Sequence, residues 1–133
     1  MTMKKNLKSM FLAGMSFLAM SASIFALKPD LVVLSVTSPN LDYGIVQVAV
    51  KNQGDAPAAS CYIAIRITTV EGVMKIFSHY VPPMAVGKTQ VMQTQTGFLL
   101  SQAKYEVTVD RSNTVPESNE LNNVLKGQFG GKP

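Results

Sequence analysis

The sequence predicts an all-β fold, an antiparallel β-sandwich of about seven strands. Short runs in which apolar and polar residues alternate recur along the chain, and clusters of Gly, Pro and Asn separate them. No stretch has a convincing helical periodicity. Alternating runs place one side-chain set against a core and the other in water, which favours antiparallel sheets with one wet face.

The first two predicted strands cover residues 30–36 ("DLVVLSV") and 45–52 ("IVQVAVKN"). The cluster Ser-Pro-Asn at 38–40 predicts the turn between them. After the second strand, Gly54 is able to take a positive φ and Pro57 is unable to extend a central ladder. The residues that share one face of the second strand are Val46, Val48 and Val50.

The third run, "CYIAIRIT" at 61–68, alternates most clearly, so Cys61 and three isoleucines are expected to face the core. Glu71 and Gly72 predict a hairpin turn into a fourth strand at 73–81. The run "KTQVMQTQT" at 88–96 is polar on both faces and suits a sheet edge, which is able to pair with a partner chain. The last two predicted strands are "KYEVTVD" at 104–110 and "NVLKGQF" at 123–129.

Residues 1–26 are expected to be a secretory signal peptide. Three lysines (Lys4, Lys5 and Lys8) precede an apolar run at 10–20, and small residues follow it. That run is shorter than the roughly 20 residues that span a bilayer, although a retained membrane anchor is the alternative. The expected domain then covers 27–128, with a flexible tail at 129–133. An exported chain of this kind would be periplasmic, extracellular or on the cell surface, with no stable membrane insertion after removal of the signal.

Charge and composition exclude several function classes. The chain has 12 basic and 8 acidic residues, but three of the basic residues lie in the predicted signal, which leaves 12 − 3 = 9 against 8. So balanced a charge gives no support for nucleic-acid binding, which needs a clustered basic face. A single cysteine, Cys61, precludes an internal disulfide, and one histidine, His79, with no tryptophan limits catalysis.

Four segments resemble the CARDB family, the cell-adhesion-related domain found in bacteria. They are "PDLVVLSV", "VAVKNQGDAPA", "VPPMAVGKTQVM" and "YEVTVDRSNTVPESNELNNV", in that order, and together they extend from about Pro29 to Leu125. The resemblance implies an immunoglobulin-like antiparallel β-sandwich that makes protein or surface-glycan contacts without catalysis.

The polar stretch at 109–124 is the strongest candidate site. Asp110, Asn113, Glu117 and Glu120 could supply oxygen ligands to calcium, although the spacing fails the EF-hand pattern because Val115 occupies its glycine position. A structural role is the main alternative, in which polar side chains satisfy the backbone where strands end. The residues assigned such structural roles are Asn52, Gly54, Tyr105, Asn122 and Asn123. For Tyr105 the alternatives are a hydrogen-bonded tyrosine corner and a partly buried core aromatic.

Catalytic interpretations are weaker. A carboxylate-dependent hydrolase would need a cleft that so short a chain without tryptophan is poorly suited to build. Ser78 and His79 are neighbours on a predicted strand and point to opposite faces, so they do not form a nucleophile and base. The sequence therefore predicts an exported, non-enzymatic binding or structural module with no cofactor unless calcium binds. A calcium-stabilised module and an assembly factor acting through its open edge are the alternatives, and the oligomeric state stays open.

Overall fold

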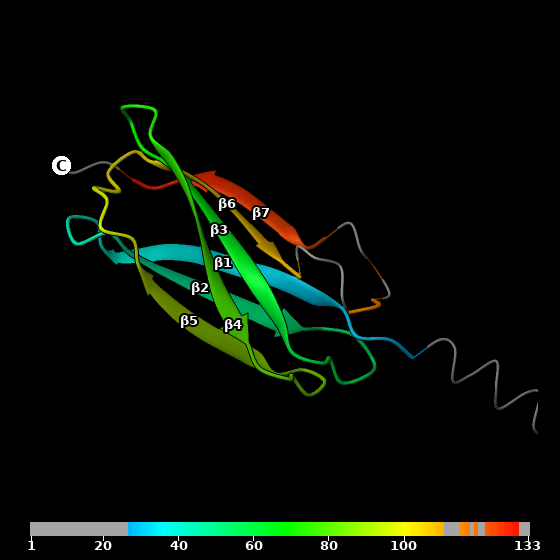
Figure 1. The fold of residues 1–133 in the computed structure, drawn as a ribbon. Helices are drawn as coiled ribbons and strands as arrows, with labels where there is room; N and C mark the ends of the chain where they lie inside the picture. Colours follow the sequence, from blue (N-terminus) through cyan, green and yellow to red (C-terminus); the bar gives the residue numbers. More distant parts are fainter. Residues whose placement is uncertain (1–26, 111–114, 118, 120–121, 131–133) are drawn as a thin grey trace, which may run out of the picture.

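Seven antiparallel strands in two facing sheets form the part of the chain described by the computed structural model, residues 27–110, 115–117, 119 and 122–130 (Figure 1). This arrangement confirms the predicted all-β sandwich. The strands are β1 (Leu31–Asn40), β2 (Ile45–Asn52), β3 (Cys61–Thr68), β4 (Met74–Val81), β5 (Thr89–Gln95), β6 (Lys104–Val109) and β7 (Val124–Gln128). No helix in the described residues is long and apolar enough to cross a membrane.

The smaller sheet has the order β1-β2-β5. Strand β1 is longer than the sequence predicts, because it continues through Pro39 to Asn40 instead of turning after Val36. Its pairing with β2 shifts register between Val33 and Ser35 and again between Thr37 and Asn40. A proline is tolerated there because β1 is an edge strand, where one side of the backbone has no partner to bond.

The larger sheet has the order β4-β3-β6-β7. The β3–β4 hairpin forms where Glu71 and Gly72 predict it, with the Gly72 amide donating to the Thr69 carbonyl at 2.9 Å. Gly72 has φ 89°. Strand β5 lies at an edge of the other sheet, as the polar run at 88–96 predicts.

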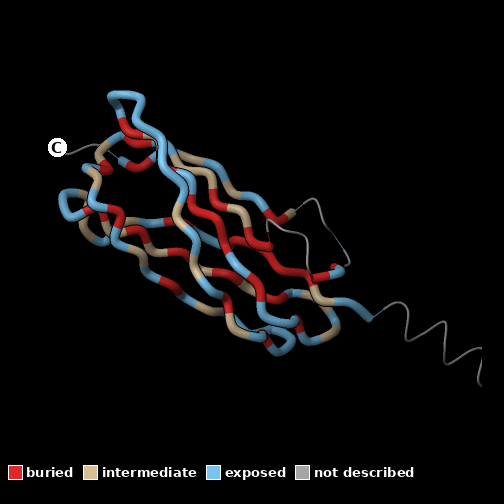
Figure 2. The backbone as a smooth tube through the Cα atoms, in the orientation of Figure 1, coloured by how far each residue is buried: buried red, intermediate tan, exposed pale blue. Residues whose placement is uncertain are grey.

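The core lies between the two sheets, and the buried positions alternate most regularly along β2 (Figure 2). Cys61 and the three isoleucines of β3 are buried, as are the three predicted valines of β2. Period-two alternation is therefore sufficient to assign the inward faces of both central strands.

The flexible tail expected from residue 129 does not begin there. Phe129 is buried, and its ring centroid lies 4.9 Å from that of Tyr105. Its amide donates to the Ala103 carbonyl at 2.9 Å, and the Gly130 carbonyl accepts from the Gln102 amide at 3.2 Å. Burying an aromatic ring against the end of the core is favourable in free energy, because it removes apolar surface from water. Residues 131–133 lie outside the described residues.

Candidate functional site

Strand β1 begins and β6 ends at the same end of the sandwich (Figure 1). Hydrogen-bonded polar side chains cluster at this end. The members of this polar cluster come from segments far apart in the sequence. The buried polar residues of this end are Asp30, Asn52, Asp110, Glu117 and Asn123. Carboxylates and amides removed from water in this way need internal hydrogen bonds, and each of them has some.

Glu117 links the polar connection to the first strand. One carboxylate oxygen, Oε2, accepts the backbone amide of Leu31, and Oε1 accepts Nδ2 of Asn123 at 2.6 Å. The side-chain Nδ2 of Asn123 also donates to the backbone carbonyl of Val109 at 3.3 Å. The backbone carbonyl of Asn123 accepts the backbone amide of Val109 at 2.9 Å. Glu117 and Asn123 together therefore join β1 to the end of β6.

Asp110 makes the turn that leaves β6. It has φ 53°, in the left-handed region that aspartate tolerates better than most residues. Its Oδ2 accepts the Val115 amide at 2.8 Å, and its own amide donates to the Tyr62 carbonyl at 2.9 Å. A side chain that bonds the backbone a few residues ahead stabilises a turn after a strand ends.

Asp30 is a site residue that the sequence analysis did not single out. Its carboxylate accepts Nδ2 of Asn122 at 2.9 Å through Oδ1 and Nε2 of Gln53 at 2.9 Å through Oδ2. Asn122 thus bonds a side chain, whereas the sequence analysis expected it to satisfy the backbone. The only sequence signal for Asp30 is a charged residue directly before an apolar strand.

Asn52 and Gly54 shape the turn beside Asp30. The Asn52 side chain is fully buried; Oδ1 accepts the amides of Asp30 and Gly54, both at 3.1 Å. Its Nδ2 donates to the carbonyls of Ala56 at 2.8 Å and Met84 at 3.2 Å. Gly54 is not among the glycines with positive φ; a Cβ there would instead collide with the backbone of residues 28–30. Close approach of two backbones, rather than a special φ, requires this glycine.

The two buried carboxylates affect the nearby thiol. Burial, and then the negative charges of Asp110 and Glu117, raise the pKa of Cys61 to about 11. The thiol is therefore protonated at neutral pH, whereas a reactive cysteine needs thiolate character and exposure. Cys61 behaves here as a small core residue.

Of the four residues predicted to bind calcium, Asn113 and Glu120 lie outside the described residues. Asp110 and Glu117 are described, and their carboxylates already accept N–H groups. Among the described residues, no group of three or more His, Cys, Asp or Glu side chains is placed to hold a metal ion. Two buried acceptors of the cluster, Oδ1 of Asn122 and of Asn123, have no hydrogen-bond partner among the described residues.

Ser78, His79 and Tyr105, the other residues considered in the sequence, lie on strands of the larger sheet. His79 and Ser78 lie on β4, and Nδ1 of His79 is 2.9 Å from the Tyr80 carbonyl oxygen. Tyr105 packs against the core and against the ring of Phe129, which matches the core-aromatic alternative. Ser78 is exposed on the outer face of its sheet, and His79 is next to it on the opposite face.

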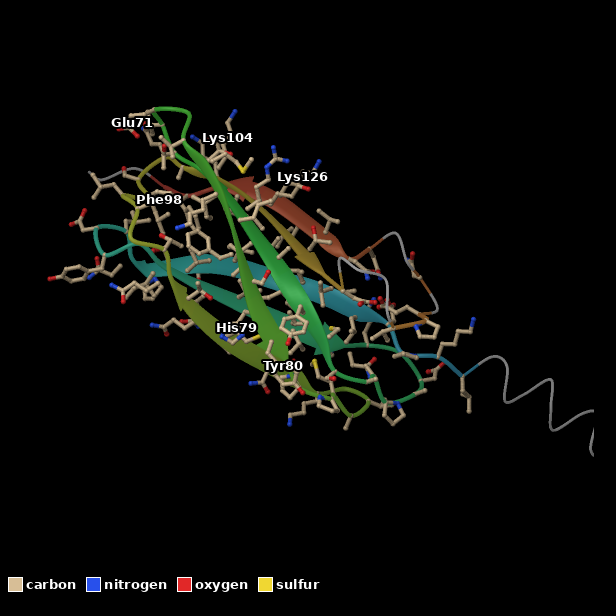
Figure 3. All side chains as sticks on the ribbon, in the orientation of Figure 1. Glu71, His79, Tyr80, Phe98, Lys104 and Lys126 are labelled. Carbon is tan, nitrogen blue, oxygen red and sulfur yellow. The ribbon has the colours of Figure 1, made fainter. Side chains whose placement is uncertain are left out.

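The outer face of the β4-β3-β6-β7 sheet is a second feature that the sequence analysis missed. Tyr62 and Tyr80 are opposite one another on β3 and β4, with ring centroids 5.6 Å apart. They are 60% and 49% exposed, and their contact joins them into one exposed aromatic surface. Figure 3 labels Tyr80, Lys104 and Lys126 on this sheet. The register also places on this face Met74, Ile76, Ala64, Arg66, Glu106 and Val124.

The centre of this outer face holds a charged row and a small recess. Arg66 and Lys126 flank Glu106, with nitrogen–oxygen distances of 3.9 and 4.0 Å. The recess has a volume of about 70 Å³ beside Ala64 and Ile76. Small-molecule pockets are typically about 300–1,000 Å³. The recess is therefore the size of a contact made by a partner's side chain rather than of a ligand site.

Solved structures that resemble the chain include two small domains. One is a domain of a putative cell surface protein from Methanosarcina acetivorans, 22% identical, with a TM-score of 0.64 over 80% of this chain and 94% of that one. The other is the CARDB domain of a Pyrococcus furiosus protein, solved in complex with di-metal ions. It is 24% identical, with a TM-score of 0.56 over 79% of this chain and 96% of that one. Identities this low establish the fold alone.

The family assignment rests on the sequence match. No curated protein matches the chain. The CARDB family model matches residues 28–127, which cover every strand of the sandwich except the final residue of β7. CARDB is a non-catalytic type of domain, and the chain belongs to the CARDB family.

Proposed function

We propose that this chain is an exported, non-enzymatic contact module that binds a protein partner through the outer face of its four-stranded sheet. The observation that carries the proposal is the exposed pair Tyr62 and Tyr80, in edge contact with each other at the sheet surface. Tyrosines present a large, rigid contact area at low entropic cost, and they are enriched at protein interfaces.

The two outer faces of the sandwich differ, and the difference supports a protein contact on one of them. The face of the β1-β2-β5 sheet carries glutamine, threonine and aliphatic side chains, among them Gln47, Thr37 and Val91, but no aromatic residue and no arginine. The opposite face combines two tyrosines and aliphatic side chains with a charged row. Aromatic residues and arginine are enriched at protein interfaces, and of the two outer faces only that of the four-stranded sheet carries them.

The described site geometry also favours contact over catalysis. Asp110 and Glu117 are bonded to backbone and amide N–H groups at the buried end of the sandwich. A second recess, about 280 Å³, is lined by Thr68, Thr69, Val70, Gln102, Lys104 and Gln128. Lys104 is the one titratable side chain of its lining, and the lining has no carboxylate, imidazole or thiol beside that lysine to complete a base or nucleophile. A surface glycan is the alternative partner, and this polar recess is where it would be sought.

The test is site-specific photocrosslinking in the cells that produce the chain. A photoreactive phenylalanine analogue replaces Tyr62, and in a matched control it replaces Tyr43, which is 65% exposed in the β1–β2 turn. A discrete protein adduct is expected from position 62 and none from position 43. Equal adducts from both positions, or none from position 62, would contradict a contact at this face.

A calcium-stabilised module is the second candidate, because Asn122 and Asn123 each leave a buried amide oxygen without a partner among the described residues. Such oxygens, together with carboxylates, are the donors that calcium prefers. The similar CARDB domain from Pyrococcus furiosus was solved with di-metal ions, which supports a test of metal binding in this chain. Asp110, Asn113, Glu117 and Glu120 remain the proposed ligands.

Thermal unfolding in calcium and in chelator tests this candidate. A ligand that binds only the folded chain stabilises it by roughly 2.7 kcal/mol when its concentration is about 100 times Kd. The midpoint should therefore rise in millimolar calcium, and Glu117→Gln should reduce the rise. An unchanged midpoint would exclude a calcium site of useful affinity.

A further inference from the structure

Strand β4 is the least protected sheet edge in the described part of the chain. A sandwich of two open sheets has four edges, here β1, β5, β4 and β7. The register of β1 is interrupted twice and β1 contains Pro39, both of which discourage pairing with another strand. Strand β7 has only five residues and includes Gly127. Strand β5 exposes mainly glutamine and threonine, so pairing there would bury little apolar surface.

Strand β4 has none of these protections. Its eight residues pair with β3 in unbroken register, from Val81 opposite Cys61 to Met74 opposite Thr68. It contains no proline or glycine, and Lys75 is its one formally charged residue at neutral pH. Three apolar side chains on its outer face stay partly exposed: Met74 at 48%, Ile76 at 41% and Tyr80 at 49%. Long, regular and apolar edges are the ones that add a strand from another chain.

We propose that two copies of this chain pair through β4, antiparallel about a two-fold axis, so that their four-stranded sheets join into one. This self-association goes beyond the proposed contact function because it uses the backbone edge of β4, although Tyr80 belongs to both contacts. Each copy supplies the same edge, which is the requirement for a closed two-fold interface.

The side-chain pattern of β4 suits pairing with itself. With the axis at Ser78, Ile76 of one copy lies opposite Tyr80 of the other on the outer face. Each even-numbered residue of one copy is then opposite an even-numbered residue of the other, so the outer faces of both sheets lie on the same side. Lys75 falls opposite Val81, and the two copies of Lys75 do not oppose each other. Aromatic and β-branched pairs across strands are stabilising, whereas like charges directly opposite are not.

The charge of the whole domain also permits self-pairing. Residues 27–133 contain 9 basic and 8 acidic side chains, a difference of +1. Two copies therefore meet with little net repulsion, as proteins near zero net charge do. An edge of eight residues covers less than the roughly 800 Å² per partner of a stable interface. The dimer is accordingly weak and depends on concentration.

Sedimentation velocity of residues 27–133 over a dilution series tests the proposal. Ile76→Lys places a charge on the outer face of β4, opposite Tyr80 of the second copy. Val91→Lys is the matched control, because Val91 is a β-branched residue, 51% exposed, on edge strand β5. The wild-type chain and Val91→Lys should associate reversibly with the same Kd, and Ile76→Lys should raise the Kd by at least about tenfold. Met74→Lys replaces Ile76→Lys if circular dichroism shows that the latter does not fold.

Amide chemical shifts in the same dilution series locate the interface. Concentration-dependent changes should concentrate on 74–81 in the wild-type chain. A wild-type chain that stays monomeric to millimolar concentration would overturn the proposal, and so would equal weakening by both lysine substitutions. A dimer whose shifts lie on β5 would assign the interface to the other edge. A position-62 adduct of twice the mass of the chain would report the β4 dimer, whereas an adduct with a different protein reports the proposed contact, so the two proposals fail separately.

Discussion

At the scale of single residues, buried amide and carboxylate side chains form the hydrogen bonds that water would otherwise make to backbone groups at the strand ends. Asn52 is the clearest case, because one side chain serves the backbone of Asp30, Gly54, Ala56 and Met84. The sequence indicates Asn52 through the segment "VKNQGDAP", although its partners lie as far away as Met84. Residue type predicts that such a side chain will bond the backbone, and only the fold decides which backbone.

Asn52→Ala tests this role. The substitution leaves the buried backbone groups of Asp30 and Met84 without the side chain they bond, so it should lower the free energy of unfolding by about 3 kcal/mol. The control is Asn40→Ala, whose Oδ1 accepts two amides in an exposed turn where water can substitute. It should cost at most about 1 kcal/mol. Urea unfolding of both variants measures the difference; equal losses would contradict the role given to Asn52.

Glu117→Gln tests the carboxylate of the polar cluster. Both oxygens accept N–H groups, and a glutamine would turn an N–H toward one of these donors. The free energy of unfolding should fall by about 1–3 kcal/mol. Glu71→Gln, in the exposed β3–β4 turn, should change it by less than about 0.5 kcal/mol. A Glu117→Gln chain as stable as wild type would mean that the carboxylate does not join β1 to the connection.

Cys61 predicts a dependence on alkaline pH. Burial and the neighbouring carboxylates raise its pKa from 9.0 to about 11 in the folded chain. The unfolded chain therefore loses the thiol proton first, and stability falls as pH rises from about 9 to about 11. Below that window the contribution of the thiol is constant. The difference in unfolding free energy between wild type and Cys61→Ala should narrow across the window; a constant difference would contradict the raised pKa.

At the scale of elements, alternation predicts the strands well where one face is buried. The β2 and β3 runs show this, because their inward residues are the predicted valines and isoleucines. The end of β1 is harder to predict from the sequence, because Ser38, Pro39 and Asn40 form a typical turn cluster. As an edge strand with two register shifts, β1 accommodates that cluster in extended form. Local propensity is overridden here by pairing with β2.

Gly54→Ala tests how tightly the turn after β2 approaches the entry to β1. A Cβ at this position would overlap the backbone of Lys28 and Asp30, which are not flexible side-chain ends. The substitution should therefore cost about 2 kcal/mol or more of unfolding free energy. Gly130→Ala is the control, because a Cβ there meets nothing within 4 Å. Unfolding curves of the two variants that coincide would mean that the turn has room to move.

At the scale of the whole molecule, the family and the sandwich follow from the sequence, whereas the polar cluster does not. Asp30 and Asn122 bond across a separation of 92 residues, and no local pattern predicts that pairing. The exposed tyrosine pair is equally hidden, because Tyr62 and Tyr80 become neighbours only through the β3–β4 register. Periodicity predicts which face a residue occupies but not which residues of other strands lie beside it.

These two features underlie the proposed division of roles, in which the polar cluster stabilises the sandwich and the outer face of the four-stranded sheet is the proposed contact for a partner. The most direct test compares the crosslinking yield from position 62 in two further backgrounds. In Glu117→Gln, the yield per folded molecule should equal that of the parent, even though stability falls. In Tyr80→Ser, the yield should drop several-fold, because the neighbouring ring at the contact is removed. An unchanged yield in Tyr80→Ser together with a lost yield in folded Glu117→Gln would contradict this division and assign binding to the polar cluster.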